Sequence, residues 1–185
     1  NALKNSIMLS SIVTVLQILC TALVGYAFAR LKFKGQGILF AIVIASIIVA
    51  PSTIELPLKM SLMNFLGTGK SLLGSPTIMY IFAATGMGIK SGIFIWLFRQ
   101  FFRGIPIELE ESAEIDGAGV IRTFWSVMLP NARGAIVTVA LFSFVWQYND
   151  LYWAQLYKYH DANVMPLLTT GLASSADTFN SVVGT

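Results

Sequence analysis

The stretch SIMLSSIVTVLQILCTALVGYAFA, from Ser6 to Ala29, contains no charged side chain. An α-helix rises about 1.5 Å per residue, so this run is long enough to cross the hydrocarbon core of a bilayer, which is about 30 Å thick. Arg30, Lys32 and Lys34 follow directly and mark where the chain would leave the apolar layer. The run therefore predicts a membrane-spanning helix.

Three further apolar runs have the same character, at residues 38–54, 76–98 and 134–153. Of the 185 residues, 56% are hydrophobic and 11% are charged, whereas a typical soluble domain has about 25% charged residues. Backbone polar groups in lipid must be satisfied internally, and these runs are too long and continuous for the alternating strands of a barrel. We therefore predict an all-α membrane protein, a polytopic helical bundle with four spans in a single transmembrane domain over residues 1–185.

Basic residues divide unevenly between the two sides of this predicted bundle. Most of them follow the first and third spans: Arg30, Lys32, Lys34, Arg99, Arg103, Arg122 and Arg133. Fewer lie in the connections on the other side, namely Lys59, Lys70 and Lys158. The positive-inside rule places the first set in the cytoplasm. The net charge of +3 then needs no nucleic-acid partner, and the chain is expected to be a multi-pass protein of the cytoplasmic membrane.

The segment 103–133 between the last two spans differs from the rest of the chain. It holds five of the nine acidic residues: Glu108, Glu110, Glu111, Glu114 and Asp116. Pro106 followed by carboxylates predicts a helix start, and Gly117 with Gly119 predicts a stop or bend. A second short helix is expected over 120–129, ended by Pro130.

Phe124, Val127 and Met128 could share the apolar face of this second helix. The whole segment is then a helix-turn-helix at the cytoplasmic face. The alternative is an amphipathic connector that only anchors the loop at the lipid interface. The run of carboxylates argues against it, because anionic lipid repels carboxylates.

The residues of this segment resemble the EAA loop of ATP-binding-cassette (ABC) importer permeases. That pattern is Glu-Ala-Ala, three residues, Gly, nine residues, a branched apolar residue, one residue and Leu-Pro. The matching positions are Glu111, Ser112, Ala113, Asp116, Gly117, Ala118, Val127, Leu129 and Pro130. The departures are Ser112 for alanine and Val127 for the usual isoleucine, while Gly134 stands where many members carry a second proline.

Other stretches are similar to the carbohydrate-type permeases, those of the maltose and glycerol-phosphate kind. They are residues 26–30 (YAFAR), 98–102 (FRQFF) with Ile105-Pro106, and 148–153 (YNDLYW). Tyr148 replaces the usual Trp of the last stretch. The resemblance therefore covers most of the chain.

The resemblance implies the type I importer permease fold, which usually has six spans, so one span is expected before Asn1 and one after Thr185. It implies a bacterial inner-membrane protein that pairs with a second permease subunit, which is usually a different chain in carbohydrate systems. Two cytoplasmic ATPase subunits would bind below and an extracytoplasmic solute-binding protein above.

The 103–133 loop would dock into the ATPase and transmit its closure, so the chain would be a transport subunit and no enzyme. The coupling residues carried over are Glu111, Ser112, Ala113, Asp116, Gly117, Ala118, Leu129 and Pro130. Glu111 and Asp116 would either contact arginines of the ATPase or cap the helices. ATP and Mg²⁺ would be bound by the partner, and no cofactor by this chain.

The sequence supports no catalytic or metal site of its own. Gly69-Lys70-Ser71 matches the end of a phosphate-binding loop, but the glycine required five residues earlier is Asn64. Cys20 is the single cysteine, which excludes an internal disulfide or a cysteine zinc site.

Polar groups at membrane depth indicate where a solute could bind. Trp146, Tyr148, Asn149 and Asp150 mix aromatic rings with hydrogen-bonding groups, which is the chemistry of sugar recognition, and Lys90 lies inside the third span. Two alternatives stay open: Asn149 and Asp150 could hold helices together, and the neighbouring aromatics Tyr152 and Trp153 could form an interfacial belt. Lys90 is expected to pair with a carboxylate or helix-end carbonyls, more as a structural residue than as part of the path.

Two other functions remain alternatives to carbohydrate import. A permease of the same type could carry amino acids, phosphate or polyamines. An ion-coupled carrier would need no ATPase, but it would leave the pattern from Glu111 to Pro130 unexplained. The sequence does not name the sugar.

Overall fold

The computed structural model describes residues 2–48, 60, 76–88, 90–151, 154, 167 and 170–176. Its elements with defined bounds are all helices, which confirms the predicted all-α fold. They are α1 (Ala2–Arg30), α2 (Gln36–Ile48), α4 (Thr77–Ala84), α5 (Ser91–Gly104), α6 (Glu108–Ile115), α7 (Val120–Thr123), the π-helical η2 (Phe124–Met128), α8 (Leu129–Asn131) and α9 (Arg133–Tyr148).

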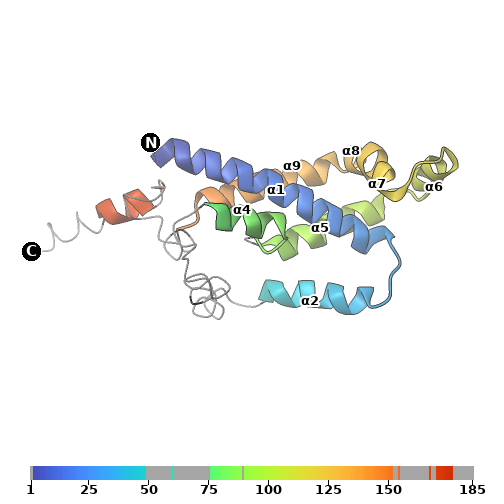
Figure 1. Cartoon of the computed structure of the whole chain (residues 1–185), viewed down its shortest axis with the longest axis horizontal. Helices are drawn as coiled ribbons and strands as arrows, with labels where there is room; N and C mark the ends of the chain where they lie inside the picture. Colours follow the sequence, from blue (N-terminus) through green and yellow to red (C-terminus); the bar gives the residue numbers. More distant parts are fainter. Residues whose placement is uncertain are drawn as a thin grey trace, which may run out of the picture.

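Helix α1 is the central element of the bundle. It packs along α5, α9 and α4, while α2 lies against α5 (Figure 1). The short helices α6 to α8 lie together at the end of the bundle where α1 finishes. The connections after α1 and after α5 are therefore on the same side, as the distribution of basic residues predicted.

The backbones of α1 and α5 meet closely at Gly25. A Cβ atom at this position would lie 2.6 Å from the Cβ of Phe98 and 3.1 Å from the backbone nitrogen of Arg99. Gly92 likewise allows α5 and α2 to approach closely, since a Cβ there would lie 2.9 Å from the side chain of Ile47. Small residues at such crossings let helices pack where lipid offers no hydrophobic driving force.

A buried amide joins three helices at the middle of the bundle. The side chain of Gln17 on α1 is 1% exposed. Its Nε2 donates to Ser91 Oγ on α5 at 2.9 Å, and its Oε1 accepts from Ser143 Oγ on α9 at 2.7 Å. These paired polar groups set the relative positions of α1, α5 and α9.

The predicted third span, residues 76–98, is not one helix. Helix α4 ends at Ala84, where Gly86 adopts a φ of +75° and the backbone N–H groups of Gly86 and Met87 return to the carbonyls of Ala83 and Phe82. This closure is a Schellman cap, which terminates a helix whatever its hydropathy. Helix α5 begins at Ser91 and runs six residues beyond the predicted end to Gly104, so the continuous span was wrong.

The other spans agree with their predictions where the structure describes them. Helix α1 contains the whole run from Ser6 to Ala29, and α9 covers residues 134–148 of the predicted fourth span, 134–153. Helix α2 ends at Ile48. Residues 49–59, residues 61–75 with the Gly69-Lys70-Ser71 stretch, and residues 152–153 lie outside the described residues. By length and apolar composition α1 could cross a membrane, and the bent pair 120–131 with 133–148 gives a second candidate. The four-span count stays a prediction.

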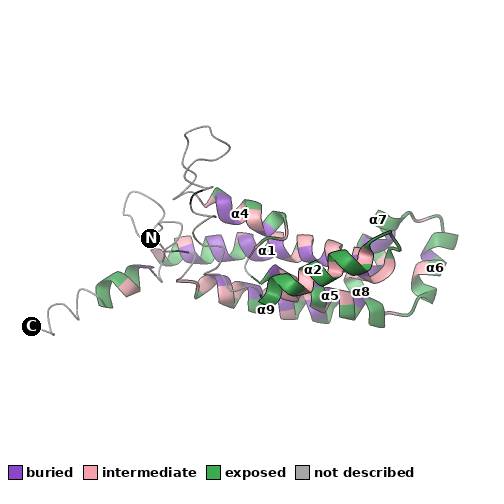
Figure 2. Ribbon diagram, turned by 90° about the horizontal axis from the view of Figure 1, so that it is seen from below, coloured by how far each residue is buried: buried purple, intermediate pink, exposed green. Residues whose placement is uncertain are grey.

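Burial follows this arrangement. Buried positions concentrate on α1, α4, α5 and α9, whereas α2 has no buried residue and presents an exposed surface (Figure 2).

We expect Gly25→Val to destabilise the bundle. The added side chain would push α1 away from α5, and overpacking of this kind costs about 1–3 kcal/mol. The matched control is Gly37→Val, because a Cβ at Gly37 meets nothing within 4 Å. The measurement is the amount and thermal stability of the full-length subunit in membranes. Equal stability of the two variants would contradict the close crossing.

Candidate functional site

Helix α6 is built as the sequence predicted. Glu108, Glu110 and Glu111 occupy its first turn, where carboxylates interact favourably with the helix dipole. At its end Gly117 has a φ of +78°, and the N–H groups of Gly117 and Ala118 donate to the carbonyls of Glu114 and Ala113, both at 2.9 Å. This is again a Schellman cap. A Cβ at Gly117 would meet nothing within 4 Å, so glycine is needed here for its backbone angle and not for close packing within the chain.

The second arm of the loop runs from Val120 to Asn131 as one helical segment with a π-helical middle. Phe124 and Met128 are buried and Val127 is half-buried, which confirms the predicted apolar face. Pro130 does not end the helix. It stands in the first turn of α8, where its missing N–H is not required, and the chain bends by 79° between Asn131 and Arg133.

Aromatic side chains fasten this arm to the bundle. Phe124 of η2 contacts Tyr26 of α1 and Phe102 of α5, with ring centroids 5.2 Å and 6.2 Å apart, and Tyr26 meets Phe102 at 5.7 Å. Met128 is completely buried in the same cluster. Any displacement of η2 is therefore passed to α1 and α5, because close-packed side chains move together.

An ion pair fastens the first arm. Arg30 Nε at the end of α1 lies 3.4 Å from Glu110 Oε2, with the two side chains 13% and 12% exposed. Arg30 also donates through Nη2 to the carbonyl of Ile105, and Tyr26 lies beside the Glu110 carboxylate. Sequence reasoning did not single out Glu110 from its neighbours. The available signal was an arginine at the end of the first span with carboxylates in a loop on the same side.

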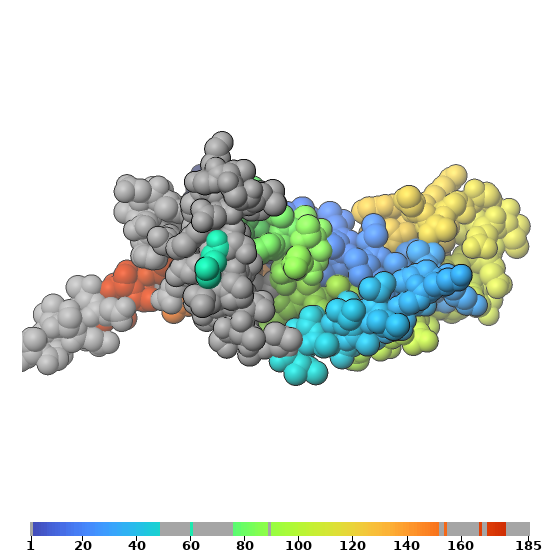
Figure 3. Space-filling model, turned by 60° about the horizontal axis from the view of Figure 1, so that its bottom comes forward, coloured from blue at the N-terminus to red at the C-terminus, as the bar shows by residue number. Residues whose placement is uncertain are grey.

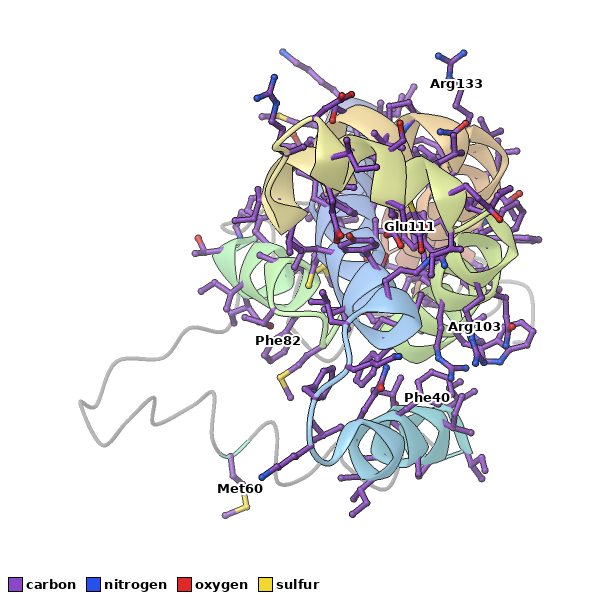
Figure 4. All side chains as sticks on the ribbon, turned by 90° about the vertical axis from the view of Figure 1, so that its right-hand side faces the viewer. Phe40, Met60, Phe82, Arg103, Glu111 and Arg133 are labelled. Carbon is purple, nitrogen blue, oxygen red and sulfur yellow. The ribbon has the colours of Figure 1, made fainter. Side chains whose placement is uncertain are left out.

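The predicted coupling residues fall into two groups. Glu111, Ser112, Asp116, Gly117 and Pro130 are exposed, whereas Ala113 is buried and Ala118 and Leu129 are half-buried. The N-caps of α6 and α7 carry no side-chain hydrogen bond, so the capping role considered for Glu111 and Asp116 is not seen at these helix starts. Figure 4 views the molecule from this end, with Glu111 on the loop.

The exposed part of the loop also carries apolar side chains. Ile115 and Ile121, on either side of the Gly117 turn, are 86% and 76% exposed. Beside them stand the exposed carboxylates of Glu111, Glu114 and Asp116. Exposed apolar side chains surrounded by polar ones are typical of a protein-binding surface.

The predicted substrate-path residues are only partly brought together. Lys90 Nζ lies 4.9 Å from the ring centre of Trp146, which stacks between Phe94 and Phe142 at 5.6 Å and 5.4 Å. Among the described residues, the side-chain contact of Lys90 is with this aromatic ring, and the expected carboxylate or carbonyl partner stays a prediction. Lys90 itself adopts a φ of +55° just before α5.

The remaining path residues lie elsewhere. Tyr148 stacks on Phe144 at 6.0 Å, and Asn149 and Asp150 come after the end of α9. Gln147, which directly precedes Tyr148, is buried and donates to Met79 Sδ at 3.4 Å, which joins α9 to α4.

With the loop and bundle in view, the chain can be compared with known proteins. Residues 7–167 match the sequence profile of the inner membrane component of binding-protein-dependent transport systems. The chain belongs to this family. The predicted family is thereby confirmed, and its members are permease subunits that hydrolyse no ATP themselves.

Individual relatives agree with the family assignment. The alpha-glucoside transport system permease protein AglG of Rhizobium meliloti is 35% identical over 153 residues, which is 80% of this chain and 38% of that protein. The trehalose/maltose transport system permease protein MalG of Thermococcus litoralis is 28% identical over 166 residues, 89% of this chain and 57% of that protein. The chain spans about half the length of the curated relatives it matches.

A solved structure has the same fold. A chain of a bacterial ABC transporter for import of the acidic polysaccharide alginate superposes with a TM-score of 0.71 over 91% of this chain and 55% of its own length. Its sequence identity is 22%.

We expect Glu110→Gln to loosen α6 from the end of α1. Removing one partner of a mostly buried ion pair leaves an uncompensated charge and costs about 3–5 kcal/mol. Amide hydrogen exchange over residues 105–118 of the full-length subunit should rise. Glu111→Gln, which removes the same charge from an exposed neighbour, should leave the exchange rates unchanged, and equal rates in both variants would contradict the role of the ion pair.

Proposed function

We propose that this chain is the membrane-spanning permease part of an ATP-driven importer for a carbohydrate, and that its loop over residues 105–132 docks on a cytoplasmic ATPase subunit. This loop is the part of the predicted 103–133 segment that lies between the end of α5 and the start of α9. The observation that carries the proposal is the contrast between the two sides of the loop. Its tip is exposed and apolar at Ile115 and Ile121, whereas its base is held by Phe124, Met128 and Glu110.

The tip has the chemistry of a docking element. Two isoleucines can fill an apolar groove, and the surrounding carboxylates can pair with arginines at the groove's rim, since charge-assisted hydrogen bonds are directional and strong. A turn fixed by the Gly117 cap loses little conformational freedom on binding.

The base of the loop is packed so that a movement of the tip is passed on to the helices of the bundle. When the ATPase subunits close on ATP, a force on the tip passes through Phe124 to α5 and α1, and through the bend after Asn131 to α9. ATP then biases an equilibrium between inward-open and outward-open arrangements of the bundle. The ATPase subunit binds ATP and Mg²⁺ and carries out hydrolysis.

The remaining partners follow from the same assignment. A second permease subunit, a different chain in this proposal, completes the path in the bacterial cytoplasmic membrane. A solute-binding protein delivers substrate on the side opposite the loop. The family description, an inner membrane component of binding-protein-dependent transport, supports both.

Carbohydrate is the substrate class best supported. Relatives are named for transport of alpha-glucosides, trehalose and maltose, and arabinooligosaccharides. Within the chain, the Lys90 ammonium lies 4.9 Å from the ring centre of Trp146, so a hydrogen-bond donor and an aromatic side chain come together there. Aromatic faces and hydrogen-bond donors are the usual partners of sugar rings, and polar groups at membrane depth usually line a cavity or a protein interior.

We expect Ile115→Asp combined with Ile121→Asp to abolish ATPase binding without unfolding the subunit. Both positions are exposed, so surface substitution should change stability by less than about 0.5 kcal/mol. The full-length subunit, co-expressed with its genomic neighbours and purified through its own tag, should no longer retain the ATPase. Retention equal to wild type would remove the tip from the interface, and a stable wild-type subunit without any ATPase would overturn the proposed function.

We expect Gly117→Val to uncouple transport from ATP hydrolysis, because a β-branched residue at a φ of +78° is strained and the turn must change shape. Gly119→Val is the matched control, since Gly119 has a φ of −74° and a Cβ there meets nothing within 4 Å. Uptake of labelled sugar per ATP hydrolysed in proteoliposomes should fall for Gly117→Val and much less for Gly119→Val. Similar losses would show that residue volume, and not backbone angle, decides the effect.

A further inference from the structure

A cavity of about 280 Å³ lies between the end of α1, the start of α2 and α5. It opens at the same end of the bundle as the 105–132 loop. Its lining comprises Phe28, Ala29, Arg30, Leu31, Lys32, Gln36, Gly37, Phe40, Arg99 and Arg103. None of the family-derived coupling or substrate-path residues belongs to this lining, so the cavity is separate from both proposed sites.

The cavity is strongly cationic. Arg30, Lys32, Arg99 and Arg103 line it, and none of the described acidic side chains does. Arg30 is balanced by Glu110. Arg99 is fixed by a 3.1 Å hydrogen bond from Nε to the carbonyl of Phe28 and by its position over the Phe40 ring, 4.0 Å from the centroid. Neither contact of Arg99 supplies a negative charge.

The two other cations have no compensation in the part of the chain that the structure describes. Neither the Lys32 nor the Arg103 side chain makes an ion pair or a hydrogen bond there, and Arg103 is near enough to Arg99 to repel it electrostatically. Like charges gathered around one cavity raise the free energy of the empty site. An anion with several oxygen acceptors would relieve that repulsion, and a phosphate group matches guanidinium geometry.

The surface next to the cavity is apolar. Helix α2 begins at its edge and exposes Ile38, Leu39 and Ile42 along its length, and Figure 3 shows this helix lying on the outer face of the molecule. Leu31 and Phe33 are also exposed and alternate with lysines. Figure 4 places Arg103 and Phe40 on neighbouring helices at this end.

We propose that the cavity binds the phosphate headgroup of an anionic phospholipid from the leaflet on the loop side. The headgroup lies between Lys32 and Arg103, and the acyl chains lie along the exposed face of α2. The apolar surface favours a lipid over free phosphate, because soluble phosphate would leave that face unused. Basic pockets between membrane helices are suited to such headgroups.

Occupancy of the cavity also supports the loop. Arg30 lines the cavity with one side and pairs with Glu110 on the other. An anion beside Lys32 and Arg103 lowers the local positive potential and so stabilises the arginine-rich end of α1 to which α6 is attached.

The test uses the full-length subunit with whatever subunits co-purify, reconstituted in nanodiscs of phosphatidylcholine with and without phosphatidylglycerol. Native mass spectrometry measures retained lipid. We expect preferential retention of phosphatidylglycerol, reduced about tenfold in the double variant Lys32→Gln, Arg103→Gln. The control Lys34→Gln, Arg122→Gln removes the same charge outside the cavity lining and should retain the lipid.

Three results would overturn the proposal. The first is no preference for phosphatidylglycerol, and the second is an equal loss of retained phosphatidylglycerol in both double variants. The third is that inorganic phosphate raises the thermal stability of the phosphatidylcholine sample as much as phosphatidylglycerol does. Both double variants must keep the thermal stability of wild type in phosphatidylcholine. This inference rests on the membrane orientation in the proposed function, but its readout is independent of transport. Lipid retention without a bound ATPase would count against the importer alone.

Discussion

The two hydrogen bonds of the Gln17 carboxamide set the relative positions of the three longest described helices of the bundle, namely α1, α5 and α9. In lipid, apolar side chains gain little by leaving lipid for another helix, so directional bonds and close packing must set how helices register. Gln17 donates to Ser91 and accepts from Ser143, which fixes α5 and α9 against α1 at one level. Ser91 is the first residue of α5, so the same bond fixes where that helix starts after the break.

The alignment of α5 and α9 against α1 determines which side chains come into contact at the two ends of α5. At its start, Lys90 is placed over Trp146, which lies one helical turn beyond Ser143 on α9. Toward its end, after the close crossing at Gly25, Phe102 reaches Tyr26 and Phe124. The position of the loop therefore depends on contacts made at the middle of α1, about two turns away.

The sequence predicted those features that depend on local chemistry. The charge-free run of α1, the acidic first turn of α6 and the Gly117 cap are properties of short stretches, and the structure contains all three. The break before α5 was missed because hydropathy measures transfer into lipid and does not register a helix cap at Gly86. The choice of Glu110 over Glu111 as the partner of Arg30 was also missed. Adjacent helical residues point about 100° apart, and only the packing of α6 decides which one faces α1.

The candidate path shows the same limit. Trp146, Tyr148, Asn149 and Asp150 are close in sequence, but residues two apart on a helix face different directions, and α9 ends before the last two. Lys90 joins Trp146 from the position just before α5, which no sequence spacing predicts. Gln17 was not singled out from the sequence, because the run from Ser6 to Ala29 also contains serine and threonine residues. The partners of its amide come from residues 74 and 126 positions away.

The buried side chains form two clusters, and Gln17 lies between them along α1. One cluster joins Leu9 and Val13 to α4, and the other joins Ala22 and Tyr26 to α5, η2 and α9. The chain passes from one to the other through the break, where Gly86 and Lys90 both have positive φ. A non-glycine residue in that conformation is strained, so the broken geometry persists because the hydrogen bonds at Ser91 hold it. Helix α1 runs unbroken through both clusters, and Gln147 joins α9 to Met79 of α4. A force applied at the loop therefore reaches the second cluster first, and it reaches the first cluster through α1 and α9 rather than through the connection between α4 and α5.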